Sequence, residues 1–212
     1  MTAPFRFFDS ARLNCPTGVS ASTLREFRDA VESADPGVLH HHLRETPLRF
    51  AFTTFDYPND FALWAAEALE SRALAERLAS LDAFHARDLE ALRLRVLDIV
   101  ELGFGDEDPN RTVPRGQEFH FSSSVVVRFD LGIEAHTLEE LRARLGEVPG
   151  TSIYSHVYEA RLLNPAGEDD VSRWLGLAGH EAQAARLRDL DIYLLPLEGC
   201  RRVVLELLEE QP

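Results

Sequence analysis

The chain has 212 residues, of which 45% are hydrophobic and 27% are charged, a composition typical of globular proteins. Its formal net charge of −14 disfavours binding to nucleic acid or to anionic membranes, because both are themselves negatively charged. No apolar run approaches the roughly 20 residues that span a bilayer, and the N-terminus lacks the pattern of a secretory signal. We therefore expect a soluble cytoplasmic protein.

Several kinds of chemistry are excluded by residue usage. All 22 basic residues are arginines, so a lysine Schiff base and a phosphate-loop lysine are ruled out. The two cysteines, Cys15 and Cys200, are far apart in the sequence and are expected to be reduced and structural. The sequence also contains no nucleophile elbow, CxxC pair or HExxH motif.

The chain contains an internal repeat. Residues 4–48 align without a gap to residues 118–162, with 12 identities in 45 columns. Such similarity predicts a protein of two homologous repeats. We place the first repeat at residues 4–102, a linker rich in Gly, Pro, Asp and Asn at 103–116, and the second repeat at 117–210.

Each repeat is predicted to open with a short strand. In the first, Phe5 and Phe7 begin an alternating apolar pattern that becomes irregular before Pro16, a residue that disfavours a central strand. In the second, apolar residues occupy alternate positions from Phe119 to Leu131. We expect the two strands to pair into one small sheet.

About five helices are predicted to follow each strand. The first helix begins at a capping box, Thr23 to Glu26 in the first repeat and Thr137 to Glu140 in the second. The later helices are predicted over 38–43, near 60, over 74–81 and over 88–102, and again over 152–162, near 170, over 180–190 and over 197–208. The expected fold class is therefore α+β and mainly helical, with the repeats related by a pseudo-twofold axis.

Four kinds of candidate functional residue recur in both repeats. They are His42, Glu45, Asp60 and Trp64 in the first repeat and His156, Glu159, Asp170 and Trp174 in the second. The histidine and glutamate of each repeat are spaced i, i+3, which places them on one face of a helix. We interpret the eight residues as candidates for binding a ligand or a partner.

A structural role explains the same residues. Asp60 and Asp170 stand where a helix N-cap is expected, so a facing histidine can donate to the carboxylate and join two helices. The tryptophans would then belong to the core. Each glutamate would pair with an arginine, and Arg28 and Arg142 also recur.

A metal site is the third interpretation. If the two histidine helices meet, His42, Glu45, His156 and Glu159 would form a His2Glu2 site for a transition metal. The recurring aspartates would then orient the imidazoles. The neighbouring His40 and His41 do not add to such a site, because adjacent helical side chains point in different directions, and we expect both to be solvated.

The chain resembles a known family in four segments. These are VLHHHLRE (38–45), NDFALWAAEAL (59–69), SIYSHVYEARLL (152–163) and DDVSRWLG (169–176). They resemble a bacterial family of tandem-repeat proteins that is known only as a domain of unknown function. The resemblance covers nearly the whole chain and implies a small soluble helical protein, with no activity to carry over.

The functional expectation is a non-enzymatic binding or scaffold protein without a cofactor. It would use its acidic surface and the seam between the repeats to engage a protein or a small molecule, and assembly into a homo-oligomer is an open alternative. The alternative is a metal-dependent enzyme with a His/Glu cluster where the repeats meet. The absence of a complete catalytic set favours the first reading.

Overall fold

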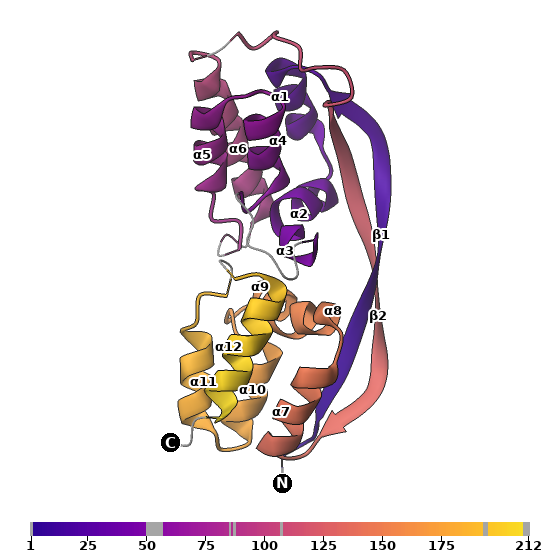
Figure 1. Ribbon diagram of the computed structural model, residues 1–212, viewed down its shortest axis with the longest axis vertical. Coiled ribbons are helices and arrows are strands. Elements are labelled where there is room, and N and C mark those ends of the chain that lie inside the picture. Colours follow the sequence, from indigo (N-terminus) through magenta and orange to yellow (C-terminus); the bar gives the residue numbers. More distant parts are fainter. Residues whose placement is uncertain are drawn as a thin grey trace. The chain divides into compact units, whose positions relative to one another are not determined.

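The computed structural model describes residues 2–49, 57–84, 86, 88–106, 108–192 and 195–209. Two long strands, β1 (Phe5–Ala21) and β2 (Phe119–Ala135), form a two-stranded sheet (Figure 1). Helices make up most of the remaining structure. The fold is therefore mixed α+β and mainly helical, as predicted, and the predicted pairing of the opening strands is confirmed.

The two strands are antiparallel. Arg6 of β1 donates to Asp130 late in β2, whereas Thr17, further along β1, donates to the carbonyl oxygen of Phe121 early in β2. Each strand has 17 residues, so the prediction of short strands was wrong. β1 continues through Pro16, because both strands of a two-stranded sheet are edge strands, and an edge tolerates a residue without an N–H.

Burial differs along the strands. The buried residues lie toward the ends and include Phe5, Phe7 and Ala21 of β1 and Phe119, Phe121 and Ala135 of β2. In the middle of β2, Val125, Val127 and Phe129 continue the same alternation but are exposed. The alternating apolar pattern therefore predicts the strand correctly, but it does not show which part of the strand is buried.

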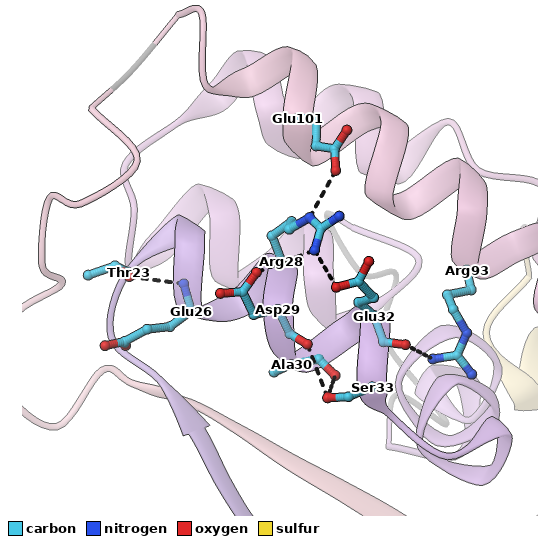
Figure 2. A network of polar contacts seen from close by, with 9 residues as sticks. All are labelled: Thr23, Glu26, Arg28, Asp29, Ala30, Glu32, Ser33, Arg93 and Glu101. Carbon is cyan, nitrogen blue, oxygen red and sulfur yellow. Dashed lines mark hydrogen bonds and ion pairs between the residues drawn. The ribbon is translucent and has the colours of Figure 1, made fainter.

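The helices after β1 are α1 (Leu24–Ser33), α2 (Pro36–Arg44), α3 (Thr46–Arg49), α4 (Asp60–Glu67), α5 (Arg72–Ala79) and α6 (Leu89–Gly103). The predicted capping box of α1 is confirmed. Thr23 Oγ1 accepts the N–H of Glu26 over 3.1 Å (Figure 2). The Glu26 carboxylate in turn accepts the N–H of Ser22 over 2.7 Å. Satisfying these free N–H groups fixes the start of the helix.

The helices after β2 are α7 (Leu138–Glu147), α8 (Gly150–Ile153), the π-helical segment η1 (Tyr154–Glu159), α9 (Ala160–Leu163), α10 (Asp170–Leu177), α11 (Glu181–Arg188) and α12 (Leu197–Glu209). The second capping box is also confirmed, because Thr137 accepts the N–H of Glu140 over 3.2 Å. The segments α8, η1 and α9 follow one another directly and cover the helix predicted over 152–162. None of the described helices combines the length and apolar character needed to cross a membrane.

The chain divides into two compact units. The N-terminal unit contains Leu13–Thr46 and Phe55–Val125, and the C-terminal unit contains Met1–Arg12, Pro47–Thr54 and Val126–Pro212. The start of β1 thus belongs to the unit of α7–α12, and the start of β2 belongs to the unit of α1, α2, α4, α5 and α6, whereas most of α3 is assigned to the C-terminal unit. Each set of helices packs against the strand that opens the other half of the sequence.

These units differ in kind from the predicted repeats. The repeats at 4–102 and 117–210 are ranges of sequence similarity, whereas the units are defined by packing, and β1 and β2 pass from one unit to the other. Beyond Gly103, the described part of the predicted linker contains no helix or strand. It packs on the N-terminal unit, where the N–H of Val113 donates to the carbonyl oxygen of Ser22 over 2.8 Å.

Aromatic rings anchor the strand ends. In the N-terminal unit Phe27 of α1 stacks on Trp64 of α4, with 5.0 Å between ring centroids, and meets Phe119 of β2 edge-on at 5.3 Å. In the C-terminal unit Phe5 of β1 lies edge-on to Trp174 of α10 at 6.3 Å. Burying one such side chain stabilises a fold by about 2 kcal/mol, so these rings hold the strand starts against the helices.

Candidate functional site

The side chain of His42, on α2, is hydrogen-bonded at both ring nitrogens. Nε2 accepts the main-chain N–H of Ser122 over 2.9 Å, and Nδ1 lies 2.8 Å from Oδ2 of Asp60. Because a main-chain N–H can only donate, Nε2 carries no proton, and the proton on Nδ1 points at Asp60. The buried neutral imidazole therefore joins α2 to α4 and β2 within the N-terminal unit.

His156, in η1, makes the same two bonds in the C-terminal unit. Its Nε2 accepts the main-chain N–H of Phe8 over 2.9 Å, and its Nδ1 lies 3.0 Å from Oδ2 of Asp170. Phe8 corresponds to Ser122 in the alignment of the two halves, so each histidine binds the same position of a strand. We call each set of histidine, aspartate and strand N–H a histidine clamp.

The two tryptophans add a second link between helix and strand. The indole N–H of Trp64 donates to the carbonyl oxygen of Gln117 over 2.8 Å, and that of Trp174 donates to the carbonyl oxygen of Ala3 over 2.9 Å. Ala3 and Gln117 each stand one residue before the aligned ranges, so they correspond as well. Both indoles are buried, as a core role predicts, and each fixes the residue two positions before a strand.

The recurring aspartates are not the helix caps that the sequence predicted. The caps of α4 and α10 are the preceding residues, Asn59 and Asp169, which accept N–H groups over 2.9 Å and 2.7 Å. Asp60 and Asp170 occupy the first helical position instead, where a negative charge favours the helix dipole. Burial raises the pKa of Asp170, but the hydrogen bond from His156 and nearby arginines outweigh it and lower the pKa overall.

Glu45 lies in a polar cluster of the N-terminal unit. His41 Nδ1 is 2.7 Å from Glu45 Oε2, His40 Nδ1 is 3.6 Å from Oε1, and the Ser124 hydroxyl donates to Oε1 over 2.6 Å. The expectation that His40 and His41 are solvated was therefore wrong, because a buried carboxylate draws both rings inward. Burial raises the pKa of Glu45, yet these hydrogen bonds hold it well below its ordinary range.

Glu159 pairs with an arginine, whereas Glu45 is bound by histidines and a serine. Arg12 Nη2 donates to Glu159 Oε1 over 2.9 Å, and the Arg12 guanidinium lies 4.8 Å from the centre of the Tyr154 ring. An arginine partner was predicted, but Arg12 lies on β1 and is not one of the recurring arginines. The two glutamates therefore occupy corresponding positions, one directly after α2 and one in η1, and differ in their partners.

The recurring arginines join helices. Figure 2 shows Arg28 of α1 between two carboxylates: Nε donates to Glu101 of α6 over 2.8 Å, and Nη1 donates to Glu32 of α1 over 2.5 Å. Arg142 of α7 pairs with Glu209 of α12. The expectation that these arginines pair with Glu45 and Glu159 was wrong, because Arg28 joins α1 to α6 and Arg142 joins α7 to α12.

A second pair of arginines was missed by the sequence analysis. Arg93 of α6 donates to the carbonyl oxygen of Val31 over 2.6 Å, and Arg201 of α12 donates to that of Leu145 over 2.6 Å. Val31 and Leu145 correspond in the alignment, and both stand in the last turn of a helix whose carbonyls need donors. A shared Glu-x-x-Arg pattern on the final helices could have indicated them, but it lies outside the aligned range.

The geometry limits what the histidines can do chemically. In each clamp the Nε2 lone pair receives a main-chain N–H, and Nδ1 carries a proton, so neither nitrogen is directed at a metal or a substrate. Within the described parts of the chain, no three His, Cys, Asp or Glu side chains form a group that could hold a metal ion. The arrangement is suited to holding strands against helices.

Comparison with known proteins gives a family. The model of a family of unknown function, DUF5752, matches residues 2–209. The chain belongs to this family. Among solved structures, this DUF5752 protein is similar to OrfY from Thermoproteus tenax, with 30% sequence identity and a TM-score of 0.78 over 98% of this chain and 94% of that one. A search of curated proteins gave no match.

The predicted resemblance to a family of unknown function is thus confirmed. The comparisons do not show that the family is bacterial or built from tandem repeats, and the similar structure comes from an archaeon. For this DUF5752 protein, the comparisons carry no statement about activity, ligand or partner.

Proposed function

We propose that this DUF5752 protein is a non-enzymatic binding or scaffold protein built from a duplicated unit. Duplication is supported by residues that correspond in the sequence and make corresponding bonds: His42 and His156, Trp64 and Trp174, and Thr23 and Thr137. Arg93 and Arg201 extend this correspondence to the final helices. Such agreement over distant elements is expected of two copies of one ancestral unit.

The observation that carries the proposal is the occupation of both ring nitrogens in each clamp. A general base or a metal ligand needs a nitrogen lone pair that faces the reacting group or the ion. In both units that lone pair faces a main-chain N–H of a strand. The residues that the two halves share therefore support a structural role for the clamps. In this proposal, binding takes place at other surfaces of the protein.

The net charge indicates which partners such a scaffold would accept. At −14 the protein repels nucleic acid, and a basic protein or a small molecule held in a local site is favoured. The proposal predicts a thermal-shift response to at least one such ligand, with a saturable rise in melting temperature. The ligand should be recovered unchanged, and its conversion to a product would show an enzyme instead.

Metal analysis tests the proposal against a metal-dependent enzyme. We expect protein purified without a histidine tag to hold far less than one equivalent of iron, manganese or zinc. The variants His42→Ala and His156→Ala should contain as little metal as the control His120→Ala, whose side chain is exposed on β2. One equivalent of metal that disappears in folded His42→Ala would overturn the proposal.

A further inference from the structure

A pocket of about 340 Å³ opens on the C-terminal unit beside His156. Its lining comes from the start of β1, from β2 and from α10, with the aromatic residues Phe5, Phe8 and Trp174 as apolar walls. Four charged side chains complete it, namely Arg6, Arg128, Arg173 and Asp170. The volume lies within the range of small-molecule sites, and so does the combination of apolar walls with a few polar groups.

Two of the arginines share one carboxylate. Arg173 donates to Asp170 Oδ1 over 2.6 Å, and Arg128 lies 3.7 Å from Asp170 Oδ2, which also faces the His156 proton. The Arg128 guanidinium stacks 4.6 Å from the centre of the Phe8 ring, which orients the cation without neutralising it. About half of each of the two arginine side chains is exposed, so both can donate further hydrogen bonds.

The third arginine is held at the rim. Arg6 pairs with Asp130 over 2.5 Å and with Glu134 over 3.5 Å, two residues that do not line the pocket. The lining itself therefore carries three arginines and one aspartate. Because Asp130 and Glu134 offset Arg6, the local positive charge comes from Arg128 and Arg173, which together outweigh Asp170.

The corresponding positions of the N-terminal unit lack this charge. At the places of Arg6, Arg128 and Arg173 stand His120, Asn14 and Leu63, and at the places of Pro4 and Leu177 stand Glu118 and Glu67. The clamp residues are nevertheless present in that unit. Since a clamp forms without the arginines, the scaffold does not require them, and a bound anion would give a physical reason for their convergence on one pocket.

We infer that this pocket binds a small organic anion, a phosphate monoester whose organic part is apolar or ring-shaped. Guanidinium groups offer paired N–H donors that match phosphate oxygens, and a monoester carries a charge of about −1.5 to −2 at pH 7. The aromatic walls would hold the organic part. The inference rests on the proposed binding function and names the ligand class for it.

Isothermal titration calorimetry with phenyl phosphate tests the inference, with inorganic phosphate and phenol as comparison ligands. We expect one saturable site for phenyl phosphate, with an affinity higher than for either comparison ligand. The double variant Arg128→Gln, Arg173→Gln should weaken binding by about tenfold or more, because it removes charge-assisted hydrogen bonds. Arg72→Gln, Arg77→Gln removes the same charge from two arginines outside the pocket and should change the affinity by less than about twofold.

Circular dichroism melts establish that each variant is folded. If the glutamine variant unfolds, Arg128→Lys, Arg173→Lys takes its place, since it keeps the charge but loses the planar donor pair and should still bind more weakly. Equal weakening in the control variant, or no binding of phenyl phosphate to folded wild type, would overturn the anion site while leaving the broader binding proposal to its own test. Release of phenol from phenyl phosphate would support the site and overturn the non-enzymatic proposal.

Discussion

The ring nitrogen Nε2 of His42 accepts the main-chain N–H of Ser122, a residue 80 positions later in the chain. The opposite nitrogen faces Asp60, so one buried side chain ties together three segments that are distant in sequence. Removing it leaves the buried Ser122 N–H and the largely buried Asp60 carboxylate without this partner. A buried group that loses its partner costs more than the bond itself contributes.

We therefore expect His42→Ala to lower the free energy of unfolding by about 2–4 kcal/mol. His156→Ala should do the same, because its clamp has the same geometry. Urea titration followed by circular dichroism measures the loss. The control His120→Ala, at an exposed position, should stay within about 0.5 kcal/mol of wild type, and equal stabilities for all three variants would remove the case for the clamps.

The tryptophan bonds can be separated from tryptophan packing. Trp64→Phe keeps an aromatic ring against Phe27 but removes the N–H that reaches the Gln117 carbonyl. We expect a loss of about 1–2 kcal/mol from the unpaired carbonyl and the smaller ring. Trp174→Phe should lose a similar amount, and a twofold disagreement between the two would show that the units do not use the bond alike.

The helices could be predicted from the sequence because capping boxes and apolar stripes involve residues that are close together in the chain. A threonine followed three residues later by glutamate marks α1 and α7, and the apolar stripe behind Thr23 is buried as predicted. The possible bond from His42 to Asp60 was also foreseen, since both residues recur with the same neighbours. Its second bond, to Ser122, was not.

The exchange of strands lies beyond what the repeat can reveal. Sequence similarity shows that Phe5 corresponds to Phe119. The similarity would be identical whether each strand packed on the helices of its own half or on those of the other half, so it cannot distinguish the two arrangements. The length of β1 was also hidden, because Pro16 weakens a strand pattern and is tolerated only once the strand is known to lie at an edge. Arg93 and Arg201 were missed because loops of different length shift the alignment before the last helices.

Acid should weaken the N-terminal unit through Glu45. Burial raises the pKa of this carboxyl, but hydrogen bonds from His40, His41 and Ser124 hold it well below the ordinary value of 4.5. The folded protein thus takes up this proton less readily than the unfolded chain does. The contribution of Glu45 to stability is present above about pH 4.5 and is lost as the pH falls below it.

The measurement is urea unfolding at a series of pH values between about 6 and 3. Wild type should lose stability on acidification more steeply than Glu45→Gln, which has no proton to gain at this position. Glu32→Gln serves as the control, because the Glu32 carboxylate is more than half exposed and should leave the slope of wild type unchanged. Parallel slopes for wild type and Glu45→Gln would show that Glu45 is not the group responsible.

The two cysteines should differ in reactivity. Burial raises the pKa of the Cys200 thiol to about 12, whereas Cys15 on β1 is partly exposed. Because the thiolate is the reactive form, a thiol reagent at neutral pH should label one cysteine in the native protein and both after denaturation. Cys15→Ser should abolish native labelling, and rapid labelling that persists in this variant would mean that Cys200 is accessible.

The last prediction concerns the two helix caps, Asn59 and Asp169, which are alike in role but differ in charge, because the Asn59 amide is neutral and the Asp169 carboxylate is negative. The Asn59 amide donates to the carbonyl oxygen of Leu78 over 2.9 Å, whereas Asp169 accepts from the Arg161 guanidinium over 3.2 Å. Both caps are almost completely buried. A carboxylate is therefore tolerated at position 169 because a buried cation faces it.

Asn59→Asp tests this account of the caps. The new side chain can still cap α4 through one oxygen, but it sets the other oxygen against the Leu78 carbonyl in a buried place. We expect a loss of about 3 kcal/mol at neutral pH that shrinks as acid protonates the new carboxyl. Asp169→Asn should cost less, because Arg161 keeps its bonds to the Leu187 and Leu190 carbonyls. If urea unfolding ranks the two variants in the reverse order, the charge of the cap does not decide its cost, and the difference between the units must come from packing around α4 and α10.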